Sequence, residues 1–71
     1  MVPIVGLLAA AATSIGAYTL YWYARLTESE REKADRIAYD TARSVYGKFL
    51  EELTANQFKR VQEIVKRQLL K

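Results

Sequence analysis

The sequence predicts an all-α protein in which an N-terminal single transmembrane helix continues into, or is followed by, two amphipathic helices. Three observations predict it. The first 24 residues carry no charged side chain, the composition becomes strongly charged after Leu26, and apolar residues recur at helical spacing in the charged part. We place a transmembrane helix at 1–26, an extramembrane amphipathic helix at 27–53 and a basic amphipathic helix at 54–71.

The first of these segments has the length and the ends of a membrane span. A helix of 25 residues extends about 37 Å, against a hydrocarbon core of about 30 Å. A cleaved signal peptide fits less well, because it would begin with basic residues and have a shorter apolar run. Residues that prefer the membrane interface gather where the segment ends, namely Tyr18, Tyr21, Trp22, Tyr23 and Arg25.

The distribution of Lys and Arg predicts the orientation of this integral membrane protein. No basic side chain precedes the span, whereas Arg25, Arg31, Lys33 and Arg36 follow it closely. The positive-inside rule then places the N-terminus outside or in a lumen, and the C-terminal part in the cytoplasm or its equivalent, stroma or matrix.

Small residues recur four apart within the span. Residues at this spacing stack on one face of a helix, and small side chains let another helix approach closely. We therefore predict packing against other transmembrane helices through Gly6, Ala9, Ala10, Ala12, Thr13, Ser14, Gly16 and Ala17.

Three pairs in the charged part have the spacing of a capping box, in which two side chains cap a helix N-terminus reciprocally. They are Thr27 with Glu30, Ser29 with Glu32, and Thr54 with Gln57. Because neither Gly nor Pro interrupts 25–46, however, we favour one helix running to Leu53, continuous with the span or only shallowly kinked.

The two extramembrane helices are both amphipathic and differ in charge. Residues 27–53 carry seven acids and five bases, net −2, whereas 54–71 carry one acid and five bases, net +4. The last helix can fold back as a hairpin, lie on an anionic leaflet or dock on a partner, which can be a soluble protein. The hairpin and docking rank first. The residues expected to dock on a partner are Ile37, Ala38, Val45, Phe49, Leu53, Phe58, Val61, Val65 and Leu69.

The composition argues against catalysis and against nucleic acid. The chain has no His and no Cys, which are the commonest general base, nucleophile and metal ligands. We expect no enzyme, no cofactor and no metal site. A net charge of +3, with no aromatic residue on the basic face of the last helix, indicates no nucleic-acid partner.

The layout of small-residue span, aromatic and Arg exit and charged helical tail is similar to accessory single-pass subunits of respiratory, ATP-synthase and photosynthetic complexes. It also resembles the subunit e family of mitochondrial ATP synthase, whose span carries GxxxG; Ala12 and Gly16 stand at that spacing here. The resemblance implies a non-catalytic accessory or assembly subunit. A self-associating pore, holin or scaffold, and a membrane-tethered regulator that recruits a soluble partner through its last helix, are the alternatives.

Overall fold

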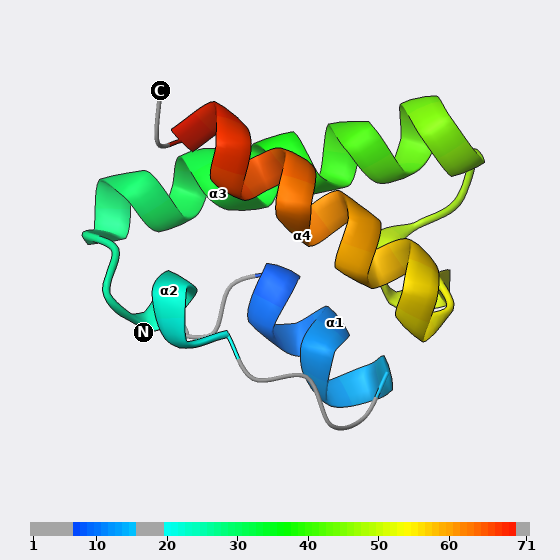
Figure 1. The fold of residues 1–71 in the computed structure, drawn as a ribbon, viewed down its shortest axis with the longest axis horizontal. Coiled ribbons are helices and arrows are strands. Elements are labelled where there is room, and N and C mark those ends of the chain that lie inside the picture. The colour runs from blue at the N-terminus through cyan, green and yellow to red at the C-terminus, as the bar shows by residue number, and fades with distance from the viewer. Residues whose placement is uncertain (1–6, 16–19, 70–71) are drawn as a thin grey trace.

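The computed structural model describes residues 7–15 and 20–69, and all the regular structure in these two ranges is helical. The all-α fold class is confirmed. Figure 1 shows four α-helices, α1 (Leu7–Ile15), α2 (Tyr21–Ala24), α3 (Glu28–Thr41) and α4 (Ala55–Leu69). A π-helical turn η1 (Ala42–Tyr46) extends α3, and a 3₁₀ turn η2 (Leu50–Glu52) precedes α4.

α3 begins at a capping box that separates it from the apolar segment. Thr27 has an extended backbone, its N–H donates to Glu30 Oε1 at 2.9 Å, and Glu30 N–H donates to Thr27 Oγ1 at 3.2 Å. The expected continuous helix through residue 27 is therefore wrong. The first N–H groups of a helix have no acceptor within that helix, and the capping box supplies side-chain acceptors at this boundary. The side chains of Thr27 and Glu30 therefore allow α3 to start as a separate helix, although neither Gly nor Pro is present here.

The middle helix also ends earlier than expected. It stops at Tyr46 instead of Leu53, because Gly47 adopts a left-handed conformation with φ +64° and its N–H bonds Arg43 O at 3.0 Å. A residue with a side chain rarely adopts this conformation, whereas Gly adopts it at little cost. The chain then turns through η2 toward α4.

α4 folds back antiparallel on α3, the hairpin arrangement left open by the sequence (Figure 1). A second capping box starts it, with Thr54 N–H donating to Gln57 Oε1 at 3.0 Å and Gln57 N–H to Thr54 Oγ1 at 3.2 Å. The contact face of α3 is a stripe of alanines, which lets the larger side chains of α4 approach closely. The buried residues of the pair are Ala34, Ala38, Ala42, Phe58, Val61 and Val65.

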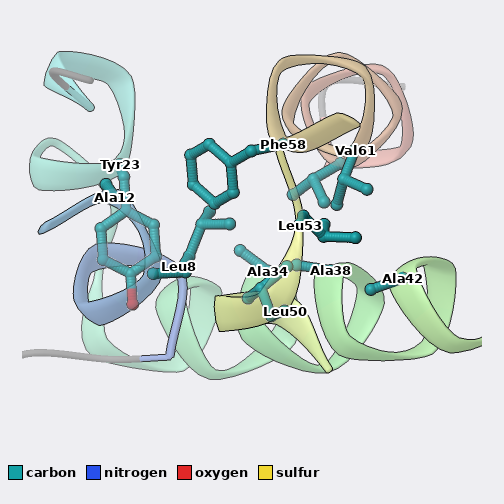
Figure 2. Close-up of a cluster of buried hydrophobic side chains, with 12 residues drawn as sticks. Leu8, Ala12, Tyr23, Ala34, Ala38, Ala42, Leu50, Leu53, Phe58 and Val61 are labelled. Atoms are coloured by element: carbon teal, nitrogen blue, oxygen red, sulfur yellow. The ribbon is translucent and has the colours of Figure 1, made fainter. Parts of the chain in front are cut away.

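α1 covers the open side of this hairpin. Its buried residues are Leu8, Ala11 and Ala12, and Figure 2 shows Leu8 beside Phe58, with Leu50 of η2 close by. In the described part of 1–26 the chain is not the single helix that we expected, because Leu20 before α2 is not helical and Leu8, Ala11 and Ala12 are buried in the same core as the hairpin. Within 7–15 and 20–69, none of the helices combines the length and the apolar character that crossing a membrane requires.

Candidate functional site

The predicted helix-packing residues lie on both sides of α1. Ala12 is buried against the hairpin and Ala9 is half-buried, whereas Ala10 and Thr13 are exposed. The hydroxyl of Thr13 donates to Ala9 O at 3.1 Å and so is satisfied within its own helix. The side chain of Ser14 is not described, and Gly6, Gly16 and Ala17 lie outside the described residues. α1 therefore contacts the hairpin with one face and turns a face of small residues outward.

Asp35 on α3 joins α1 and α2 to the hairpin. Its Oδ1 accepts the N–H of Leu8, near the start of α1, at 3.1 Å. The Tyr23 hydroxyl donates to the same carboxylate, 2.9 Å from Oδ1 and 3.0 Å from Oδ2. Burial, and then the hydrogen bond to Asp35, raise the pKa of Tyr23 well above its usual range, so the phenol stays neutral. One carboxylate thus fixes both N-terminal helices.

No pattern in the sequence indicates this role for Asp35. Its position in the sequence puts Asp35 on the flank of the apolar arc of α3, where a carboxylate is ordinarily solvated. The nearby Arg31 completes the junction, because its Nη2 donates to Ala24 O at 2.9 Å and its guanidinium lies 6.0 Å from the centre of the Tyr23 ring. A contact 27 residues apart in sequence carries no local pattern that could announce it.

The predicted membrane-interface residues are divided between solvent and core. Tyr21 is 77% exposed and Arg25 is exposed, whereas Trp22 is half-buried and Tyr23 is buried. The Trp22 and Tyr23 rings meet edge to face, with centroids 6.0 Å apart. Tyr18 lies outside the described residues. In this conformation only part of the aromatic cluster faces outward.

The predicted partner-docking residues are divided in the same way. The hairpin buries most of them in its own core, namely Ala38, Leu53, Phe58, Val61 and Val65, and half-buries Ile37 and Leu69. Val45 is 58% exposed and Phe49 is 50% exposed, the latter resting on the Tyr39 ring with centroids 6.2 Å apart. Val45 and Phe49 are thus the predicted docking residues that remain open to a partner.

A shallow groove of ≈ 340 Å³ runs between α3 and α4 beside Val45. Ile37, Val45 and Ile64 supply its apolar walls, and Asp40, Thr41, Ser44 and Gln68 supply polar groups. The groove contains neither a nucleophile paired with a base nor two carboxylates, so its groups suit the binding of a side chain better than chemistry.

The outer face of α4 carries a strip of cations, which we call the basic strip: Lys59, Arg60, Lys66 and Arg67, all exposed. Glu63 is the only acid on this helix, so α4 has a net charge of +3. The strip lies opposite Phe58, Val61 and Val65, and its exposure therefore does not depend on whether α1 covers the core.

The described residues contain no candidate metal site. No group of three or more acidic, His or Cys side chains within 7–15 and 20–69 is placed to hold a metal ion. Comparison with protein-family models, with curated proteins and with solved structures finds no match. The features available for a functional argument are therefore the apolar N-terminal segment, the hairpin surface and the basic strip.

Proposed function

We propose that the chain is a non-catalytic accessory or assembly subunit of a larger membrane protein complex, of the respiratory, ATP-synthase or photosynthetic type. In this role the N-terminal segment 1–26 packs in the bilayer against other transmembrane subunits, and the α3–α4 hairpin docks on an extramembrane surface. The observation that carries the proposal is the uncharged stretch 1–24, which ends in aromatic residues and Arg25. Among the described residues of this stretch, Ala10, Thr13, Tyr21 and Ala24 are exposed.

The outward face of α1 supports a packing role for the segment. Ala10 and Thr13 are exposed while the opposite face contacts the hairpin. Small side chains at this spacing suit close approach of a second helix, because van der Waals contact between backbones drives helix association in lipid. Under this proposal, the exposed part of the small-residue pattern contacts another subunit.

Insertion of the segment has a consequence for the hairpin. In this role α1 moves into the bilayer, and Leu8 and Ala12 leave their contacts with the hairpin. Leu50 and Phe58, which are fully buried in the structure described above, then lose that cover. An apolar surface of this kind requires a partner. The same event thus places the segment among transmembrane helices and prepares the hairpin for docking, which suits an assembly subunit.

A membrane-tethered regulator is the second candidate, and the groove beside Val45 favours it. An apolar side chain of a soluble partner would enter between Ile37 and Ile64, with Asp40 and Gln68 at the rim. Under this alternative a chain truncated at Thr54 keeps its membrane complex and loses a soluble partner.

The test of the first proposal is extraction of the tagged protein in a gentle detergent, followed by native-gel separation and mass spectrometry. We expect migration in one large complex with other membrane subunits. Migration alone, or as a small homo-oligomer, would contradict the proposal and favour the self-associating pore, holin or scaffold.

A pair of variants sharpens this test. Gly6→Leu with Ala10→Leu fills the small-residue face, and we expect it to release the protein from its complex while membrane insertion persists. Ala24→Leu is the control, because it adds a Leu side chain at an exposed residue outside that face. Equal retention of both variants in the complex would show that this face is not the contact.

A further inference from the structure

The basic strip is the largest charged feature that the proposed function does not use. Lys59 and Lys66, like Arg60 and Arg67, stand seven residues apart, which is close to two full turns. The two pairs therefore lie on one side of α4, separated by about 10 Å along the helix axis. Within the described range no carboxylate forms an ion pair with any of the four.

We propose that the basic strip of α4 is a docking surface for the anionic lipid headgroups of the bilayer leaflet next to the hairpin. The inference rests on the proposed membrane location of the chain. Long Lys and Arg side chains on a straight helix reach a common plane, and their charge is attracted to phosphate and carboxylate groups of an anionic leaflet. The apolar face of α4 is buried in the hairpin, so contact is electrostatic and does not require insertion of α4.

The hairpin makes this contact geometrically possible. An extended rod over 27–53 would have carried the last helix about 40 Å from the bilayer. Instead, α4 returns antiparallel along α3, and Figure 1 shows its red C-terminal end lying over α3 toward the end where α3 begins. Lys66 and Arg67 belong to the last turn of α4, and so lie at the end that returns toward the start of α3, which follows the apolar segment in the chain.

Other anionic partners fit the strip less well. Single-stranded nucleic acid is bound in large part by stacking its bases on aromatic rings, and the single aromatic side chain of α4, Phe58, is buried on the opposite face. The groove beside Val45, into which a protein side chain would fit, is lined by Ile64 and Gln68 of α4 and does not include the four cations. A strip without a hollow suits an extended plane of charge.

The experiment follows α4 and the N-terminal segment separately in one sample of the full-length chain. The chain has no Cys, so Asn56→Cys on the exposed side of α4 carries a unique environment-sensitive fluorophore. Trp22 is the only tryptophan, and its quenching by brominated lipid reports on the segment. The two signals are compared in phosphatidylcholine vesicles and in vesicles that also contain phosphatidylserine.

We expect the α4 probe to respond to phosphatidylserine and not to phosphatidylcholine alone. The response should fade as salt rises, since the screening length falls from about 10 Å at 0.1 M to about 3 Å at 1 M. Each cation near an anionic surface strengthens binding about fivefold. Lys66→Gln with Arg67→Gln should therefore lower the ratio of bound to unbound α4 about 25-fold. Lys33→Gln with Arg36→Gln is the control, because it removes the same charge from exposed positions on α3.

The outcomes separate this inference from the proposed function. A silent α4 probe beside a quenched Trp22 overturns the inference and leaves the proposed function intact. An α4 probe that responds beside an unquenched Trp22 supports the inference and counts against the membrane-embedded segment. Equal losses from the α3 and α4 variants, or a stronger probe response to a short DNA duplex than to anionic vesicles, also overturn it.

Discussion

Replacing Phe58 with Ala tests whether α1 and the hairpin form one folded unit. Phe58 is fully buried and is the largest such side chain, and it contacts the region where α1 meets the hairpin. Removing a buried Phe side chain costs about 3–5 kcal/mol, because burial is lost and a cavity remains. A domain of this size has a total free energy of unfolding of about 4–10 kcal/mol. We therefore expect Phe58→Ala to remove about a third or more of the free energy of unfolding, and to unfold the protein where that total lies at the low end of the range.

Phe49→Ala is the matched control, because the same side chain is removed from a site that is 50% exposed. We expect a loss of about 1–2 kcal/mol, from half of the burial term and the ring contact with Tyr39. Phe58→Leu, which keeps an apolar side chain and should cost about 1–2 kcal/mol, provides a variant that still folds if Phe58→Ala does not.

The assay is urea unfolding followed by two signals. Far-ultraviolet circular dichroism reports on all helices, and Trp22 fluorescence reports on α2 at the N-terminal junction. If α1, α2 and the hairpin unfold together, the two transitions coincide and Phe58→Leu moves both equally. The reasoning is refuted if Phe58→Ala and Phe49→Ala cost the same, or if the Trp22 transition is unchanged while the helical signal shifts.

Three further predictions concern local features. Gly47→Ala should cost about 1 kcal/mol in thermal unfolding, because φ is +64° and no neighbouring atom lies within 4 Å of an added Cβ, so only backbone strain contributes. Thr54→Ala should cost about 1 kcal/mol in urea unfolding, since the Gln57 N–H loses its acceptor. Tyr23 has its pKa raised above the ordinary 10.0, so the stability contributed by its neutral form is present below pH 10 and falls as the pH rises above it. Tyr23→Phe should flatten this alkaline decrease, measured as urea stability between neutral pH and pH 11, and Asp35 would then lose one donor.

Local chemistry in the sequence predicted where helices begin better than where they end. Two of the three capping-box pairs, Thr27 with Glu30 and Thr54 with Gln57, form as their spacing indicated, whereas Ser29 lies inside α3. A capping box needs only residues three apart, so the sequence contains all of it. Gly47 was the available stop signal for the middle helix, but its place on the polar side of the helical arc made it look like an ordinary exposed position.

The partners of the apolar faces could not be predicted in the same way. Periodicity showed which residues of α3 and α4 avoid water, and Ala38, Val61 and Val65 are buried. Periodicity does not tell whether another helix of this chain or a separate partner covers these apolar faces, because both would bury the same side chains. The bonds from Leu8 and Tyr23 to Asp35 were hidden for a related reason, because they join elements that no short pattern connects.

The compact structure and the proposed membrane-embedded state differ in free energy mainly through the surface of the hairpin that α1 covers. Lipid tails are about as apolar as a protein core, so moving Leu8 and Ala12 from one to the other changes the free energy of burial little. Complete exposure of Leu50 and Phe58 would cost about 1.5–3 kcal/mol each, so their partial exposure costs at most about 3–6 kcal/mol together. A partner that covers this surface recovers the cost and thereby favours insertion of the N-terminal segment by the same amount. Under the proposed function, therefore, docking of the hairpin and entry of the segment into the bilayer are thermodynamically coupled, and each should strengthen the other.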